Sequence, residues 1–376
     1  MDPKQQVADR VAADRDVLVG LSERLHANPE TAWEEHRSAR WTAEALADAG
    51  FEVETGYLGL ETAFRAVSGS GPFRLGLCAE YDALPGLGHA CGHNLIAAIS
   101  VGAARALATL ADDAGLTVEV YGTPAEEGGG GKIELLDRGA FAGLDFAMLA
   151  HPAPVDVAEA RPFAVSHSHV SFRGRAAHAA AYPEHGVNAA DAFTVAQVAV
   201  GLLRQQLPPS VRVHGVMTRG GEAPNAIPEL TEGRWYVRAE SLAELAEVEP
   251  RIWRCFEAGA LATVCELEVV PESKPYAELR ADEAALAAYR RNAERLGRTF
   301  ATGSDAARMN RASTDLGNVS QVVPAIHPYV GIGSLPALNH QAAFAAHCVG
   351  DEAEKALLDA ATALAWTALD RAGATS

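Results

Sequence analysis

The chain has 376 residues, of which 48% are hydrophobic and 21% charged. A chain of this length and composition can bury a sizeable core and is expected to form two domains. Its formal net charge of −18 would repel a phosphate backbone or an anionic lipid surface, which argues against nucleic acid or a membrane as a partner and favours a small-molecule ligand.

The cysteines and the N-terminal segment predict a reducing compartment. Five cysteines, an odd number scattered along the chain, do not form the pattern of a secreted disulfide framework. Residues 1–16 are polar and charged and lack the apolar core of a signal peptide, and no later apolar run is long enough to span a bilayer. The expectation is a cytoplasmic protein with reduced thiols.

Helical and strand patterns alternate through the first part of the chain. Apolar positions recur at helical spacing over residues 15–50, which predicts two opening helices, and an Ala/Leu-rich helix is expected over 94–115. Short apolar runs predict three buried strands, at 73–84, 116–122 and 144–150. This alternation favours an α/β domain with a mostly parallel sheet, in which ligands gather beyond the carboxyl ends of the strands.

The pattern changes near residue 162. An alternating strand, a long helix and further strands around a second helix follow one another, which is typical of a compact α+β unit. The helical pattern of the first domain returns near residue 276. We therefore expect an inserted domain at 162–275 between the two parts of the first domain, at 1–161 and 276–376.

Reactive side chains follow each of the three predicted strands. They are Glu80, Asp82, Glu126, Glu127 and His151. The loop after the first strand adds "HACGHN", in which Cys91 and His93 are two positions apart and can point to the same side of an extended segment. Thiolate and imidazole are donors suited to zinc, manganese or cobalt, so the groups could converge on one metal-binding rim.

The pair of carboxylates in "PAEEGGGG" allows two interpretations. Metal-assisted hydrolysis needs one carboxylate on the metal and another that takes a proton from the attacking water, whereas an acidic surface turn needs neither. The segment is not a phosphate-binding P-loop, because Glu126 stands where the first glycine belongs and Ile133 where Ser or Thr should stand. A cysteine-protease interpretation of Cys91 is disfavoured, because its histidine base would be almost adjacent in sequence.

The motifs together resemble the metal-dependent aminoacylase and carboxypeptidase family of amidohydrolases. They are "AEYDALPGLGHACGHNLIAA", "YGTPAEEGGGGK", "AHPAP", "GRAAHAAAYPEHGVNAADA", "PNAIPE", "STDLGNVSQVVPAIHP" and "NHQAAFA". The branch that contains aminobenzoyl-glutamate hydrolase and the β-alanyl-lysine dipeptidases is the most similar, through "YDALPGLGHACGHN". The resemblance implies a two-metal catalytic domain and a smaller inserted lid domain that also mediates dimerisation.

The resemblance also implies roles for individual residues. The metal ligands would be Cys91, His93, Glu127, His151 and His340. Glu126 would be the general base, and Asp82 would orient a ligand from behind. In the lid, His178 would stabilise the oxyanion, while Asn225 and Arg238 would hold the substrate backbone and carboxylate. The alternatives are a surface histidine for His178 and an exposed ion-pair partner for Arg238.

One position departs from the family pattern. The hydrolases of auxin conjugates, another branch of this family, usually have Asp where this chain has Asn94. The neutral amide predicts that a charge behind the ligands is missing and that the metal preference or pH optimum differs. The ligand residues themselves are intact.

The expected function is hydrolysis of the amide bond of a small dipeptide or N-acyl amino acid by a homodimer. Two divalent ions would assist, zinc or manganese, with cobalt as a further candidate. Two alternatives stay open: a deaminase or ureide hydrolase that uses the same site, and a metal-dependent binding protein without catalysis. The presence of Glu126 argues against the second, because a structural metal site needs no general base.

Overall fold

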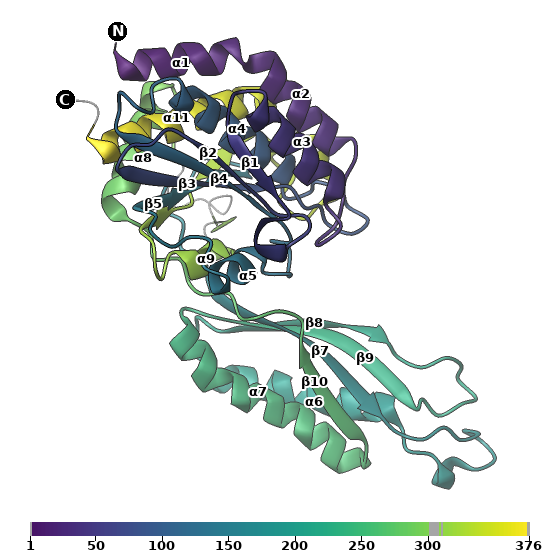
Figure 1. Ribbon diagram of the computed structural model, residues 1–376. Coiled ribbons are helices and arrows are strands. Elements are labelled where there is room, and N and C mark those ends of the chain that lie inside the picture. The colour runs from purple at the N-terminus through teal and green to yellow at the C-terminus, as the bar shows by residue number, and fades with distance from the viewer. Residues whose placement is uncertain (1, 301–307, 310, 374–376) are drawn as a thin grey trace. The chain divides into compact units, whose positions relative to one another are not determined.

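The computed structural model describes residues 2–300, 308–309 and 311–373 of the chain. It divides into two compact units, one formed by Met1–Pro162 with Leu279–Ser376 and the other by Phe163–Glu278 (Figure 1). The sequence predicts an inserted domain at 162–275. Among the described helices, none combines the length and apolar character needed to cross a membrane.

The first unit is built on a six-stranded mixed sheet. Its strands, in sheet order, are β1 (Glu52–Thr55), β2 (Phe64–Ser68), β4 (Leu116–Thr123), β3 (Phe73–Glu80), β5 (Phe146–Met148) and β11 (Ala325–Ile326). The last four strands in this order pair in parallel, and β1 and β2 add antiparallel pairings at one edge. The predicted α/β class with a mostly parallel sheet is confirmed. A short parallel pair, β6 (His151–Ala153) with β12 (Tyr329–Gly331), continues the chain beyond β5 and β11.

Helices cover both faces of this sheet (Figure 1). One face carries α1 (Pro3–Ala13), α2 (Arg15–His26), α3 (His36–Ala47), α4 (His93–Ala108), α8 (Glu283–Arg295) and α11 (Asp351–Ala372). The other carries α5 (Gly131–Asp137) and α9 (Leu316–Val319). Because side chains alternate along a strand, Leu75 and Leu77 of β3 pack in the first core while Cys78 packs in the second. Burial on both faces explains why the central strand β3 has a largely apolar sequence.

The chain opens with a helix that the sequence does not predict. In α1, Pro3 occupies the first turn and Asp2 accepts a hydrogen bond from the Lys4 backbone N–H, which are favourable start signals. Val7 and Val11 are its buried apolar residues, and the small, partly buried Ala8 packs beside them against the core. With two apolar positions one turn apart in a charged segment, the hydrophobic pattern is too weak to predict this helix.

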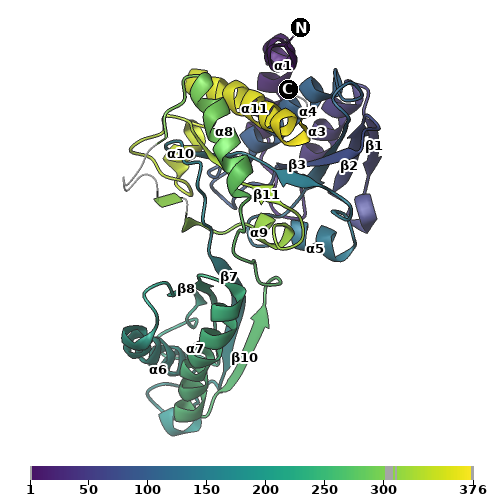
Figure 2. The ribbon, with the colours of Figure 1, turned by 90° about the vertical axis from the view of Figure 1, so that its left-hand side faces the viewer.

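The second unit is a four-stranded antiparallel sheet with two helices on one face (Figure 2). Its elements are β7 (Ala164–Arg173), β8 (Arg212–Arg219), β9 (Leu230–Ala239), β10 (Glu266–Pro271), α6 (Ala189–Leu203) and α7 (Leu242–Thr263). The strand order is β10-β7-β9-β8. Phe172 of β7, Phe193 of α6 and Phe256 of α7 meet in its core.

Candidate metal centre

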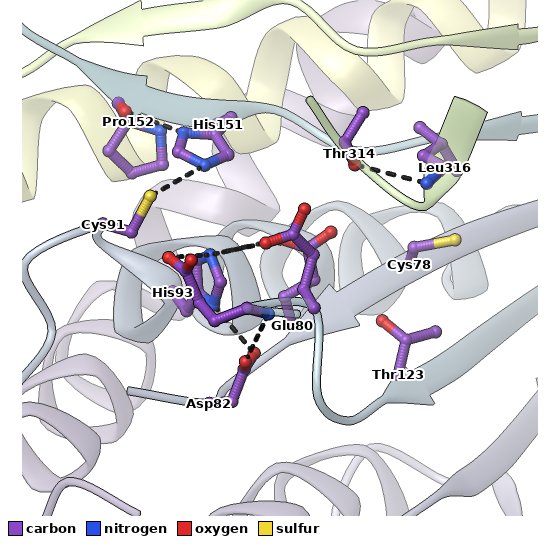
Figure 3. Close-up of polar contacts among 12 residues, drawn as sticks. Cys78, Glu80, Asp82, Cys91, His93, Thr123, His151, Pro152, Thr314 and Leu316 are labelled. Carbon is purple, nitrogen blue, oxygen red and sulfur yellow. Dashed lines mark hydrogen bonds and ion pairs between the residues drawn. The ribbon is translucent and has the colours of Figure 1, made fainter. Parts of the chain in front are cut away.

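Side chains from the carboxyl ends of several strands meet at one edge of the first unit. Asp82 follows β3, Glu127 follows β4 and His151 opens β6, while Cys91 and His93 lie at the start of α4. Figure 3 shows Cys91, His93 and His151 turned toward one another from these separate segments. The parallel topology therefore brings residues that are far apart in the sequence to one place.

The five residues expected to bind metal lie close together. The Cys91 Sγ atom is 3.5 Å from His151 Nε2 and 3.4 Å from His340 Nε2. The Oε1 atom of Glu127 is 3.4 Å from His340 Nε2 and 4.0 Å from His93 Nε2. Cys91 belongs to two triplets of donor atoms, and within each triplet all atoms lie within 4.8 Å of one another. One triplet is completed by His93 and His151, the other by Glu127 and His340.

The donor set fits divalent cations. Within the described part of the chain, the buried atoms His93 Nε2 and Glu127 Oε1 have no hydrogen-bond partner. A buried polar atom without a partner is unfavourable, and a cation would satisfy both atoms. One thiolate, three imidazoles and a carboxylate match the ligand preference of zinc and related ions.

Backbone geometry places the cysteine and the last histidine. Gly92, the residue before α4, has φ +80°, and a Cβ there would lie 2.8 Å from Pro152 Cβ, so only glycine fits this turn beside Cys91. His340 has φ 67°, which is uncommon for a residue other than glycine. Its backbone N–H donates to Ala90 O at 2.8 Å, which ties His340 to the cysteine loop.

Hydrogen bonds orient the ligand atoms. Asp82 Oδ1 accepts a hydrogen bond from His93 Nδ1 at 2.9 Å, and Asp82 Oδ2 accepts one from the Glu127 backbone N–H at 2.9 Å. His151 Nδ1 donates to Pro152 O at 2.8 Å. In both histidines the Nδ1 proton is engaged, so the Nε2 lone pair is directed into the cluster. Asp82 thus lies behind the imidazole of His93, and its role of orienting a metal ligand stays a prediction.

The electrostatics of the cluster favour charged donors. Burial and Glu127 would raise the pKa of Cys91, but His151 and His340 lower it to about 5. Burial would also raise the pKa of Glu127, but the close contact with His340, 3.4 Å away, lowers it to about 2. Glu126 behaves differently, because burial and the carboxylates of Glu80 and Glu127 raise its pKa well above the ordinary value. Glu127 thus carries a negative charge that suits a cation, whereas Glu126 holds a proton more readily than an ordinary carboxyl group.

A buried triad of charges lies beside the cluster: it joins Glu80, which the sequence places at the same rim, to Lys132 and Asp315, for which the sequence predicts no role. Lys132 Nζ is 2.6 Å from Glu80 Oε1 and 2.7 Å from Asp315 Oδ1, and all three side chains are fully buried. The Lys132 backbone N–H also donates to Asp315 Oδ2 at 2.9 Å. Burial would raise the pKa of Glu80, but Lys132 and the nearby histidines lower it to about 2. The other oxygen, Glu80 Oε2, is 3.6 Å from His93 Nε2, so the triad supports a carboxylate that faces the cluster.

The residues expected to bind substrate belong to the second unit. His178 is exposed, and its Nδ1 accepts hydrogen bonds from the backbone N–H groups of Ala180 at 3.3 Å and Ala181 at 3.1 Å. Those bonds leave the proton on Nε2, so His178 presents a donor to its surroundings. The Asn225 backbone oxygen accepts from Ala179 N at 3.0 Å, which holds the Asn225 segment beside His178.

Arg238 is half-buried on β9 of the same unit. Its Nε donates to His214 Nε2 at 3.2 Å, and the positive charge of Arg238 contributes, after burial, to a lowered pKa of His214. The guanidinium therefore has a neutral partner on the edge strand at this position.

Asn94 is the position at which the sequence departs from the family pattern. Its amide nitrogen donates to Ser22 Oγ at 2.9 Å and to Cys348 O at 2.9 Å, within the core between α2, α4 and the segment before α11. A carboxylate could not donate to the carbonyl group. Asn94 thus joins the helices around the site, and its effect on metal preference or pH optimum stays a prediction.

Comparison with known proteins agrees with this arrangement. Residues 76–354 match the sequence pattern of peptidase family M20/M25/M40. The chain belongs to this family. The Xaa-Arg dipeptidase of Mus musculus is 41% identical over 382 residues, which cover 98% of this chain and 88% of that protein. One of the subunits of the p-aminobenzoyl-glutamate hydrolase of Escherichia coli is 33% identical over 283 residues, 70% of this chain and 59% of that protein. The M20-family chain is accordingly a peptidase or amidohydrolase.

Solved structures share the fold of the M20-family chain. An aminobenzoyl-glutamate utilization protein of Klebsiella pneumoniae superposes with a TM-score of 0.72 at 21% identity, covering 97% of this chain and 98% of the other. A dinuclear metal-binding M20 peptidase of Bacillus subtilis gives 0.68 at 21% identity, covering 97% and 100%. The expected family and the aminobenzoyl-glutamate branch are confirmed as relatives.

Proposed function

We propose that the M20-family chain hydrolyses the amide bond of a small dipeptide or N-acyl amino acid with the help of two divalent cations, zinc or manganese, with cobalt as a further candidate. The observation that carries this proposal is the cysteine shared by two triplets of donor atoms, because two sets of donors side by side could hold a pair of ions. The ions would be held by Cys91, His93, Glu127, His151 and His340.

When bound, the two cations would polarise the scissile carbonyl and make the attacking water more acidic. Glu126 takes the proton from that water and returns it to the nitrogen of the leaving amine. Its Oε2 atom is 3.8 Å from His93 Nε2, at the edge of the ligand cluster, and its raised pKa suits a group that takes up a proton and passes it on. Asp82 keeps His93 and the backbone of Glu127 in place during these transfers.

Substrate recognition is assigned to the inserted domain. We propose that the Nε2 proton of His178 stabilises the oxyanion, and that Asn225 and Arg238 bind the backbone and the carboxylate of the substrate. The names of the two curated relatives describe compounds in which an amide joins an acyl group to arginine or glutamate, which supports an amino acid with a free carboxylate as the leaving group. We further propose a cytoplasmic homodimer that assembles through the inserted domain.

The test is product release from a panel of substrates. Zinc- or manganese-loaded protein is incubated with β-alanyl and α-dipeptides, including X-Arg and X-Lys pairs, with N-acyl amino acids and with aminobenzoyl-glutamate, and products are identified by mass spectrometry. We expect release of a free amino acid from at least one class, loss of that release with a chelator, and recovery when metal is restored.

Other outcomes would change the assignment. Ammonia without amide cleavage would identify an aminohydrolase or ureide hydrolase that uses the same cluster. Silence across the panel, with two ions bound per chain and a ligand retained unchanged, would favour a binding protein.

Replacing His178 by Ala is expected to lower kcat about a hundredfold, because one oxyanion donor contributes at least that much to many hydrolases. His169→Ala is the matched control, since His169 is a partly exposed histidine of the same unit paired only loosely with Glu232, at 3.8 Å. Steady-state kinetics on both variants, with melting curves to verify folding, make the measurement. Normal turnover by a folded His178→Ala protein would remove the oxyanion role.

A further inference from the structure

Glu35 is fully buried although it lies in the loop that precedes α3. An acidic residue directly before a helix normally caps the free N–H groups of its first turn. Within the described residues, the Glu35 side chain makes no such hydrogen bond to α3. Its Oε1 atom instead accepts a hydrogen bond from the backbone N–H of Ala125 at 2.8 Å, a residue 90 positions away in the sequence.

Ala125 is the residue directly before the proposed base. Its φ is +55°, a left-handed conformation that costs an alanine about 1–2 kcal/mol relative to its ordinary conformations. Such a backbone persists only where the surroundings hold it. The buried carboxylate of Glu35 is the group that binds its N–H, and the Ala125 oxygen accepts from Gly129 N at 3.1 Å.

A second carboxylate binds the residue directly after the base. Asp82 Oδ2, whose residue is drawn in Figure 3, accepts the backbone N–H of Glu127 at 2.9 Å. The N–H groups on both sides of Glu126 are therefore bound by buried carboxylates from two other segments. Together these bonds set the direction in which the Glu126 side chain leaves the backbone.

We propose that Glu35 is a positioning residue that fixes Glu126 at the reaction centre through the Ala125 N–H. The inference rests on the proposed function, in which Glu126 is the base. Glu35 itself acts on the backbone and is not assigned a contact with substrate. The positioning role requires a side chain long enough to bring an acceptor oxygen to the Ala125 N–H, and it does not require a charge on that side chain.

Two conservative variants separate reach from charge. Glu35→Asp keeps the charge but shortens the side chain by one methylene, so its oxygen no longer reaches Ala125 N. Glu35→Gln keeps the reach and an acceptor oxygen but removes the charge. The loss of charge is tolerable because burial and the neighbouring Asp82 carboxylate already raise the pKa of Glu35 to about 7. Glu34→Asp, at the exposed neighbouring carboxylate, is the matched control.

We expect Glu35→Asp to lower kcat about tenfold to a hundredfold, as a displacement on the order of 1 Å does in other enzymes. Its KM should stay within about threefold and its metal content at the wild-type value, because the ligands and the substrate contacts are not changed. Glu35→Gln and Glu34→Asp should keep kcat within about threefold of the wild type. Wild-type kcat in Glu35→Asp, or an equal loss in Glu35→Gln, would overturn the proposal.

Amide hydrogen exchange on the metal-free protein gives a readout that is independent of turnover. The Ala125 amide should exchange at least tenfold faster in Glu35→Asp than in the wild type. Its exchange rate should be unchanged in Glu35→Gln. Unchanged exchange in Glu35→Asp would refute the hydrogen bond as the means of positioning, whether or not any substrate is cleaved. A wild-type chain that is inactive on the whole panel but shows the expected exchange pattern would refute the proposed function and leave the backbone contact established.

Discussion

Glu126→Gln protein is expected to lose about two to four orders of magnitude in kcat while it keeps its metal ions. The carboxylate is buried, and burial together with Glu80 and Glu127 raises its pKa, which makes it a ready proton acceptor and donor. Glutamine has the same shape and cannot take a proton from the attacking water. Steady-state kinetics and metal analysis on the same preparation make the measurement.

The control for this variant is Glu134→Gln on α5, a partly exposed carboxylate paired with Arg138 at 3.8 Å, which should keep wild-type turnover. Near-normal kcat in Glu126→Gln with both ions bound would show that another group moves the proton. Loss of one ion from Glu126→Gln would instead identify Glu126 as a ligand. The metal content is therefore measured as well, because a carboxylate oxygen of Glu126 lies within 4.8 Å of donor atoms of His93 and Glu80.

The candidate ligands could be predicted from the sequence because their signals are local. Cys91 and His93 share one short motif, Glu127 is the second of two adjacent carboxylates, and His151 directly follows a buried apolar run. The parallel topology then dictates that groups after successive strands meet at one edge of the sheet. His340 is different: it precedes a helix of only five residues, and the family motif alone singled it out.

Two of the supporting contacts could not be predicted, because each joins distant segments. The bond from Ala125 N to Glu35 spans 90 positions, and the bond from Lys132 N to Asp315 spans 183. In the sequence, Glu35 has the signature of a residue at a helix start and Lys132 follows a run of glycines. A buried charge is recognised only when its partner is known, and no spacing rule supplies a partner from another part of the fold.

Strands, too, could be predicted only where their own sequence carries a signal. Strands β3 and β4, buried on both faces, have the largely apolar sequences that predict them. Strand β1 is mostly exposed along its four residues and pairs only at the sheet edge, so its sequence carries no such signal. Strand β11 has two residues, too few for any periodicity.

Lys132→Met is expected to destabilise the first unit by about 3–5 kcal/mol, because it leaves the buried carboxylates of Glu80 and Asp315 without their cation. Urea unfolding followed by circular dichroism measures the change, with Lys355→Met as the control. Lys355 is exposed and pairs with Asp359 on the surface of α11, so its replacement should change stability by less than about 1 kcal/mol. Equal unfolding midpoints for Lys132→Met and the wild type would contradict the expectation.

A variant that neutralises Glu80, Lys132 and Asp315 together tests whether these buried charges serve stability or the metal cluster. With Glu80→Gln and Asp315→Asn added to Lys132→Met, no buried charge lacks a partner, and most of the lost stability should return. Hydrophobic or neutral residues of similar size often replace buried ion pairs without loss, so stability alone does not require this triad. Glu80, however, faces His93 Nε2 at 3.6 Å. A stable triple variant with weakened metal binding or slow turnover would therefore mean that Lys132 and Asp315 serve to keep one charged carboxylate at the metal cluster. A stable and fully active triple variant would mean that the three residues contribute only to packing.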